Sequence, residues 1–210
     1  MTTIRYVAAA DLDRHPALSA AMFRDRAAQF RDRMGWDVAV DAMGWETDDY
    51  DRADPVYVIA LDAAGGHAGS MRVLPTTGAT MLAEVFPHLT PRPIRDPHVW
   101  EVTRFCLAPG AVPGTAQRLM LAISELGLGL GLTHTVGVFD RPMVRIYRRL
   151  GWEPALLGTE GRISAGLWRF DAATHDRLCE RTGIAPARSR GWFEAGFPDI
   201  AAAGPLPIRA

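Results

Sequence analysis

The spacing of hydrophobic and polar residues along the chain predicts helices and strands in alternation. From Pro16 to about Arg33, apolar residues recur every three or four positions between arginines and aspartates, which is typical of an amphipathic helix. Further helices are expected over residues 116–130, from Asp140 to Gly151, and from Asp171 to Gly183. In the last two, an aspartate is expected to cap the start and a glycine to end the helix.

Short apolar runs between these helices predict strands. They cover residues 4–8, 56–61, 67–74, 98–108, 133–139 and 163–170. Asp62 and the Gly65-Gly66 pair predict a hairpin between the second and third runs. A short helix is expected over residues 81–86, whereas the Gly- and Pro-rich tail after about residue 190 predicts no definite element.

This order of elements favours an α/β fold. A mixed, mostly antiparallel sheet with a later βαβ portion and helices on both faces accommodates all of the predicted elements. The length of 210 residues and the 48% hydrophobic content suit one domain, which is expected to span residues 1–210.

The strand that contains HVWEVTRF, residues 98–105, carries two charges among apolar neighbours. Glu101 and Arg104 are three positions apart, so a regular strand directs them to opposite faces of the sheet. One of the two side chains would then point into the core. If both serve a single site, the strand must bulge or twist between them.

Composition narrows the classes of partner and chemistry. The chain has 23 basic and 24 acidic residues and a net charge of -1, which gives no electrostatic reason to expect nucleic acid or a membrane surface as a partner. All of the basic residues are arginine, which excludes a Schiff-base lysine and a P-loop lysine. The two cysteines and the scattered histidines indicate neither a disulfide nor a metal site. Without a signal peptide or a membrane-length apolar run, a cytoplasmic location is expected.

Nucleotide-binding and hydrolase motifs are missing from the sequence. The run GLGLGL at residues 127–132 ends a predicted helix and lacks the spacing of a dinucleotide-binding loop. Ser124, Cys106 and His134 lack the sequence surroundings of a nucleophile with its base, which argues against a hydrolase.

The acidic stretch TDDYDRAD, residues 47–54, has two interpretations. Its carboxylates either form a solvated loop or bind a cationic small molecule. In the second case Asp48 and Asp51 matter most, because a carboxylate pair beside aromatic rings attracts an ammonium or sulfonium group. The stretch lacks the glycine and the terminal glutamate of an EF-hand calcium loop.

Four sequence blocks occur in order: RAAQFRDRMGW, DDYDRADPVYV, GSMRVLPTTGATMLAEVF and VWEVTRF. Together they resemble the autoinducer synthase family, the acyl-homoserine-lactone synthases of bacterial quorum sensing. The resemblance implies a GNAT-like acyltransferase domain. It also implies transfer of a fatty acyl group from acyl carrier protein, or from coenzyme A, to the amine of S-adenosylmethionine. The methionine carboxylate then displaces methylthioadenosine and closes the lactone, so S-adenosylmethionine is a substrate and neither a cofactor nor a metal is expected.

The resemblance assigns roles to particular residues. It implies catalytic positions at Glu101, Arg104, Asp48, Asp51 and Arg72, and contacts to S-adenosylmethionine from Arg26, Phe30, Trp36, Thr103 and Arg104. Glu101 is the candidate base that takes a proton from the amine, and Arg104 is the candidate that binds the substrate carboxylate. Alternatively, Glu101 holds Arg104 or another arginine in place as a structural ion pair.

The acyl chain and its carrier are assigned to other residues. The expected acyl pocket comprises Met81, Leu82, Phe86, Phe105, Leu121 and Gly137. Gly137 stands where some members of the family have a threonine associated with 3-oxo chains, so a preference for such chains is not expected. Arg145, Arg148 and Arg149 either dock the acidic carrier protein or form a solvated helix face.

Two other functions fit parts of the sequence. A GNAT-type N-acyltransferase that uses acyl-CoA would share the fold, although a clear Arg/Gln-x-x-Gly-x-Gly pyrophosphate loop is missing. A non-catalytic protein that senses adenosylmethionine or a lactone would share the binding residues but release no product.

Overall fold

The computed structural model of the protein describes residues 3–203, which form a seven-stranded sheet in the order β1-β2-β3-β4-β5-β7-β6. Neighbouring strands are antiparallel except for β4 and β5, which are parallel. This arrangement confirms the predicted mixed sheet with one βαβ portion. The strands are β1 (Thr3–Ala8), β2 (Val56–Leu61), β3 (His67–Pro75), β4 (Val99–Leu107), β5 (His134–Asp140), β6 (Ala155–Glu160) and β7 (Ile163–Arg169).

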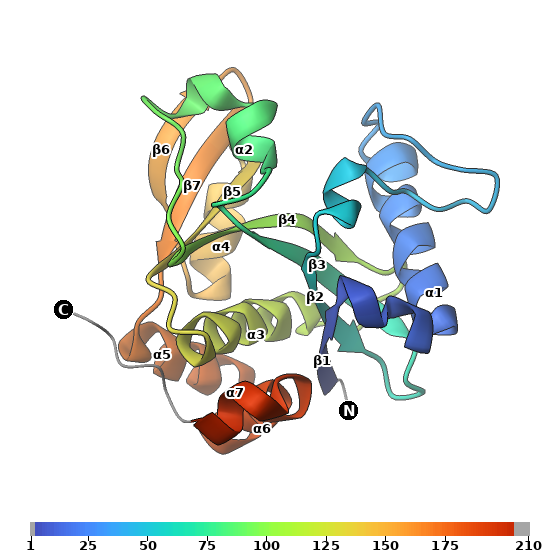
Figure 1. Ribbon diagram of the computed structural model, residues 1–210, viewed down its shortest axis with the longest axis vertical. Helices are drawn as coiled ribbons and strands as arrows, with labels where there is room; N and C mark the ends of the chain where they lie inside the picture. The colour runs from blue at the N-terminus through green and yellow to red at the C-terminus, as the bar shows by residue number, and fades with distance from the viewer. Residues whose placement is uncertain (1–2, 204–210) are drawn as a thin grey trace.

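Helices cover both faces of the sheet (Figure 1). On one face α1 packs on β3 and β4, and on the other α3 packs on β2 and β3 and is covered in turn by α5 and α6. The helices are α1 (Pro16–Ala27), α2 (Met81–Glu84), α3 (Thr115–Gly129), α4 (Met143–Leu150), α5 (Ala172–Thr182), α6 (Pro186–Gly196) and α7 (Pro198–Ala203). A π-helical segment, Ala28–Arg33, continues α1 as far as the sequence predicted.

The sheet opens between β4 and β5. These two strands pair only over Val99–Glu101 and His134–Val136, and beyond these residues they diverge (Figure 1). Beyond Glu101, β4 continues beside β3 but no longer pairs with β5. Side chains of β4 and β5 line the space between these two strands. This space and the adjoining face of β4 position the site described below.

Three sequence predictions of elements were incomplete or wrong. Strand β6 was not predicted, because an edge strand that is mostly exposed on both sides carries no alternating pattern. Helices α6 and α7 lie in the glycine-containing tail, where Trp192 and Phe193 are buried. Asp140 does not cap α4: it ends β5 and pairs with Arg162, and Pro142 precedes the first helical residue. Residues 204–210 of the predicted tail lie outside the described residues.

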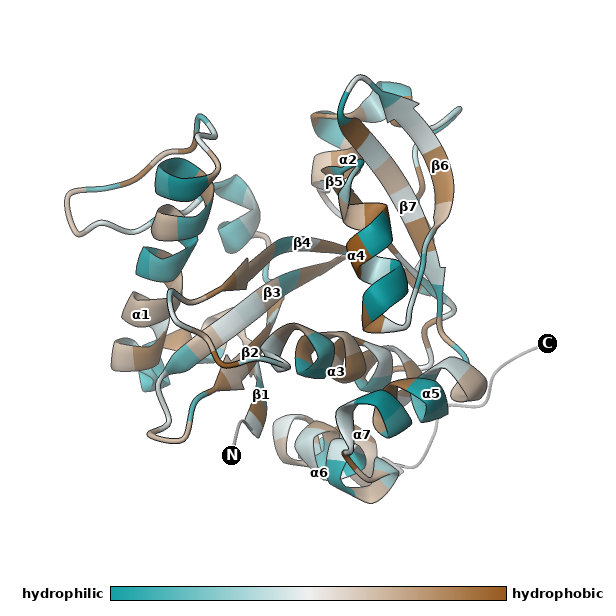
Figure 2. Ribbon diagram, turned by 180° about the vertical axis from the view of Figure 1, so that it is seen from behind, coloured by the Kyte–Doolittle hydropathy of each residue, from teal (hydrophilic) through white to brown (hydrophobic). Residues whose placement is uncertain are grey.

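No helix in residues 3–203 is long and apolar enough to cross a membrane. In Figure 2 teal positions lie among the brown ones on α1, α3 and α5.

Candidate active site

A β-bulge in β4 resolves the placement of its two charges. Arg104 and Phe105 together stand opposite Met71 of β3, and Arg104 has a φ of 53°. A positive φ is strained for a residue with a side chain, so the surrounding structure must stabilise this backbone conformation. The extra residue changes the alternation, so that the side chains packed on the α3 face are Trp100, Val102, Phe105 and Leu107. Glu101, Thr103 and Arg104 are therefore free to share the opposite face, and the predicted irregularity of the strand is confirmed.

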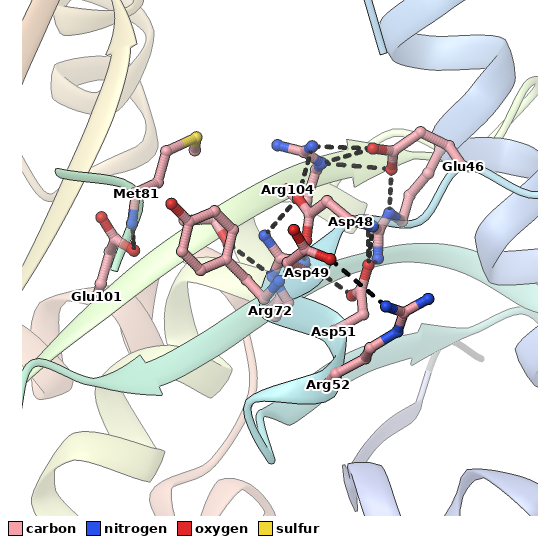
Figure 3. Close-up of polar contacts among 12 residues, drawn as sticks. Glu46, Asp48, Asp49, Asp51, Arg52, Arg72, Met81, Glu101 and Arg104 are labelled. Carbon is pink, nitrogen blue, oxygen red and sulfur yellow. Dashed lines mark hydrogen bonds and ion pairs between the residues drawn. The ribbon is translucent and has the colours of Figure 1, made fainter. Parts of the chain in front are cut away.

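Six charged side chains on this opposite face form a network of ion pairs, which we call the charged network. It contains three arginines and three carboxylates, so its formal charges cancel. Its members come from α1, from the loop that follows α1, from β3 and from β4, and Figure 3 shows the loop and strand residues converging. They are Arg26, Glu46, Asp48, Asp51, Arg72 and Arg104.

Arg26 forms the buried base of the charged network. Its Nε donates to Glu46 at 2.6 Å, and its two terminal nitrogens donate to the carboxylate of Asp51 at 2.8 and 2.9 Å. Arg26 and Glu46 are 1% and 0% exposed, so each buried charge is stabilised by its pairing with the other. Burial raises the pKa of Asp51, but the hydrogen bonds and charge of Arg26 outweigh it and hold that pKa well below its usual range.

Arg72 and Arg104 extend the charged network across the sheet. Arg72 pairs with Asp48 and with Asp51, and its Nε donates to the hydroxyl of Thr103 at 3.0 Å. Arg104 donates through Nη2 to Glu46 at 2.8 Å and to Asp48 at 2.7 Å, and through Nε to Glu46. Nη1 of Arg104 has no partner among the described residues. It is therefore the donor of this network that remains available to a ligand.

Aromatic rings lie against the arginines. The ring of Phe30 stacks on Trp36 with centroids 5.1 Å apart, and the guanidinium of Arg104 lies 5.4 Å from the centroid of Phe30. The ring of Tyr50 lies 5.5 Å from the guanidinium of Arg72. Phe30 is buried, as its place on the apolar stripe predicted, whereas Trp36 is 37% exposed. An exposed indole face provides a surface for a cationic ligand.

Glu101 lies apart from these ion pairs, beside Met81 (Figure 3). Its carboxylate accepts hydrogen bonds from the backbone N–H groups of Met81, at 2.9 Å, and Leu82, at 2.6 Å. It forms no ion pair with Arg104, so the alternative of a structural pair between them is wrong. Burial raises the pKa of Glu101 to about 7, although the two N–H groups and the charge of Arg72 favour the ionised form. A carboxyl group with such a pKa can accept a proton near neutral pH.

An apolar cavity opens on the other face of β4, where β4 and β5 diverge. Val102 and Phe105 of β4, Gly137 of β5, and Met120 and Ile123 of α3 line it. Its wall also includes three rings in mutual edge-to-face contact, from Phe139, Tyr147 and Trp168. Thr103 and Arg104 also border the cavity, but the hydroxyl of Thr103 is bonded to Arg72 and that of Thr135 to the carbonyl of Trp100, so the remaining lining suits an alkyl chain.

The structure divides the predicted acyl-pocket residues. Phe105 and Gly137 line the cavity, whereas Met81 and Leu82 belong to α2 and hold Glu101. Phe86 packs in a separate apolar cluster with Leu82, and Leu121 lies in the core, fully buried, while its neighbours Met120 and Ile123 reach the cavity. A helix turns about 100° per residue, so an apolar stripe in the sequence does not reveal which of its members reaches a cavity.

Three polar residues of the site were not predicted. Glu46 joins Arg26 to Arg104 from a position just before the acidic stretch, and its place in MGWET between two aromatic blocks was the only signal. Tyr57 donates to Asp51 at 2.8 Å, and Tyr50 lies on Arg72. Both tyrosines were visible only as apolar residues of a loop and a strand.

Within residues 3–203 no cluster of histidine, cysteine, aspartate and glutamate suits a metal ion. The predicted carrier-docking residues Arg145, Arg148 and Arg149 are exposed on α4, away from the charged network. Arg148 pairs with Glu153, while Arg145 and Arg149 have no carboxylate partner among the described residues.

The fold of the protein is GNAT-like. A putative N-acetyltransferase from Lactobacillus plantarum shares this fold, with a TM-score of 0.55, 17% identity, and coverage of 81% of this chain and 99% of that one. The autoinducer synthase model matches residues 11–168, and the chain therefore belongs to the autoinducer synthase family.

Individual members of the family agree with this assignment. An acyl-homoserine-lactone synthase of Rhizobium etli is 44% identical over 186 residues, which cover 80% of this chain and 87% of the relative. Among solved structures, the CoA-dependent acyl-homoserine lactone synthase BjaI, with SAM and isopentyl-CoA, has a TM-score of 0.79 and 26% identity. That likeness covers 88% of this chain and 90% of BjaI.

Proposed function

We propose that this autoinducer synthase makes an acyl-homoserine lactone from S-adenosylmethionine and an acyl thioester at the bulged segment of β4. The observation that carries the proposal is the placement of the charged network, Glu101 and the apolar cavity around this segment. The charged network and Glu101 lie on one face, and the apolar cavity lies on the other. An amine bound on the first face and a thioester extending from the second would meet at the bulge.

The proposed reaction has two bond-forming steps. Glu101 accepts a proton from the ammonium group of S-adenosylmethionine, and the amine then attacks the thioester carbonyl, forming the amide as the carbon–sulfur bond breaks and the carrier thiol leaves. The methionine carboxylate next attacks the methionine γ-carbon, which is bonded to the sulfonium. The bond between this carbon and sulfur breaks, the lactone ring closes and methylthioadenosine is released. No cofactor takes part in this scheme.

The charged network binds and orients S-adenosylmethionine in this proposal. The free Nη1 of Arg104 binds the methionine carboxylate, and Asp48 and the exposed ring of Trp36 favour the cationic sulfonium. Arg26 and Arg72 act indirectly, because their donors are engaged by Glu46, Asp48, Asp51 and Thr103. The bulge leaves a backbone N–H outside the strand ladder, which supplies a donor for the developing oxyanion.

The assay that tests this function measures both products. We expect purified protein with S-adenosylmethionine and a panel of acyl carrier protein and CoA thioesters to release methylthioadenosine and an acyl-homoserine lactone in equal amounts. Acylation without methylthioadenosine would indicate another N-acyltransferase, and saturable binding without either product would indicate a sensor.

The cavity between β4 and β5 is the proposed acyl pocket, and Gly137 keeps it open. A Cβ at this position would lie 3.0 Å from the carbonyl oxygen of Val102 and 3.6 Å from the Trp168 ring. We expect Gly137→Val to lower kcat/KM for the acyl donor by about tenfold or more, with a larger loss for longer chains, because the branched side chain fills the cavity. Steady-state rates over a series of acyl chain lengths measure this effect. Gly191→Val is the matched control, since a Cβ at that helix position meets nothing within 4 Å. Equal losses for all chain lengths would argue against the pocket.

Acyl carrier protein is the proposed donor, docked on the exposed arginines of α4. Arg145 and Arg149 lack carboxylate partners among the described residues, so they are available to an acidic protein. We expect Arg145→Glu combined with Arg149→Glu to raise KM for acyl-acyl carrier protein about tenfold and to leave KM for acyl-CoA within about twofold. Arg14→Glu, an exposed reversal beside β1, should change neither value. If both donors respond alike, α4 is not a protein-docking face.

A cytoplasmic location completes the proposal, supported by the two free, buried cysteines.

A further inference from the structure

The base and the charged network are held by different parts of the chain. Glu101 receives its two hydrogen bonds from α2, whereas the carboxylates of the charged network come from the loop before β2. For one substrate to contact both Glu101 and the charged network, α2 and this loop must stay at a fixed distance from each other. A single side-chain hydrogen bond, from the hydroxyl of Tyr50 to Glu84 at 2.9 Å, joins them directly.

Tyr50 is tied to the charged network at its other end. Its backbone N–H donates to Asp48 at 3.0 Å, and its ring lies 5.5 Å from the guanidinium of Arg72, with which Asp48 pairs. The hydroxyl therefore extends from a residue whose backbone and ring are both fixed by the network. Burial and the charge of Glu84 raise the pKa of Tyr50, which keeps the hydroxyl protonated and able to donate.

Helix α2 needs support from outside itself. It has only four residues, Met81–Glu84, and a helix this short is not stable without tertiary contacts. The hydroxyl of Thr80 caps its start, Leu82 is buried in an apolar cluster, and Glu84 at its end is exposed. Among the described residues, the hydrogen bond from Tyr50 to Glu84 is the polar side-chain contact that ties the end of α2 to the loop carrying the carboxylates of the charged network.

We infer that Tyr50 is a positioning residue: through Glu84 it holds α2, and thereby the N–H groups that orient Glu101, against the charged network. This inference rests on the proposed role of Glu101 as the base. Neither Tyr50 nor Glu84 needs to touch a substrate for it to hold.

The pH dependence of turnover reports on this coupling. The groups that act on Glu101 are the N–H groups of Met81 and Leu82, the positive charge of Arg72 and the negative charge of Asp48. Glu101 also interacts electrostatically with the Tyr50 phenol, while its register neighbours Leu74 and Val136 are apolar. The two N–H groups lower the pKa of Glu101. Burial, the largest influence, raises this pKa, so loss of the N–H bonds from a loosened α2 moves the titration of the base to higher pH as long as Glu101 stays buried.

Four variants test the inference. Tyr50→Phe keeps the ring on Arg72 and removes the donor, and Glu84→Ala removes the acceptor. We expect each to lower kcat about fivefold and to move the acidic limb of the pH profile upward, with KM for S-adenosylmethionine nearly unchanged. Glu84→Gln retains an acceptor oxygen for the Tyr50 hydroxyl and should keep the wild-type kcat and pH profile. The double variant Tyr50→Phe/Glu84→Ala should be no worse than either single variant.

Two results would overturn the inference in an active wild-type enzyme. One is an unchanged pH limb in Tyr50→Phe, and the other is multiplication of the two single losses in the double variant. Absence of methylthioadenosine release by the wild type would instead reject the proposed function, so the two failures are distinguishable. Circular dichroism melts of all four variants separate a loss of positioning from a loss of folding.

Discussion

Replacing Glu101 by glutamine is expected to lower kcat by about 10² to 10⁴, because the amide cannot take the proton of the attacking amine. In the wild type, turnover should rise with pH through about 7, since only the ionised carboxylate accepts a proton and burial raises the pKa of Glu101 to about 7. At pH 6 the rate should be about a tenth of its plateau. In Glu101→Gln this limb should disappear, which initial rates between pH 5.5 and 9 measure.

The stability of the same variant separates catalysis from folding. A carboxyl group whose pKa is raised by folding binds its proton more tightly in the folded state, so its contribution to stability falls as pH rises from about 4.5 to about 7. That loss is on the order of 3 kcal/mol above pH 7 and is absent in Glu101→Gln. The variant should thus have about the stability of the wild type at pH 8, because this relief offsets the loss of one N–H bond, which the amide NH2 cannot accept. Glu180→Gln, an exposed control on α5, should keep both the rate and the pH limb. A Glu101→Gln enzyme of normal rate would remove Glu101 as the base.

Replacing Glu46 by glutamine is expected to lower the free energy of unfolding by about 3 kcal/mol or more. The substitution removes the charge shared by Arg26 and Arg104 and leaves three arginines with two carboxylates, and an uncompensated positive charge beside the 1% exposed Arg26 is costly even though Asp51 still pairs with it. For a chain of this length the melting temperature should fall by roughly 6–12 °C. Because Arg104 also loses its orientation, KM for S-adenosylmethionine should rise. Thermal melts and saturation kinetics measure the two effects.

Asp49→Asn is the matched control for Glu46. Asp49 lies in the same acidic loop, but its side chain is 96% exposed and contacts only the exposed Arg52, at 3.5 Å. Its removal should shift the melting temperature by less than about 2 °C and leave turnover intact. Equal melting temperatures for Glu46→Gln and the wild type would show that Arg26 and Arg104 are adequately held by Asp48 and Asp51 alone.

The sequence by itself determined most of the sheet and the composition of the site. Period-two and period-three-to-four patterns are properties of local backbone geometry, so β1 to β5, β7 and the helices α1 and α3 could be predicted from residue spacing. The unusual charges of HVWEVTRF predicted a bulge, because no regular strand accommodates Glu101 and Arg104 on one face. The four blocks identified the family, because their residues and spacing together are far more specific than any one block alone.

Only the tertiary structure decided which residues act on one another. The partners of Arg26 lie 20 and 25 positions further along the chain, and those of Arg104 lie 56 and 58 positions before it, so no local pattern reveals them. Glu46 was therefore not distinguished from the other acidic residues, and Glu101, for which an ion pair was only the alternative interpretation, accepts hydrogen bonds from two backbone N–H groups. Spacing specifies the direction of a side chain relative to its own element. Contacts between elements arise when the sheet brings distant segments together, and there burial sets both the partners and the pKa of each charge.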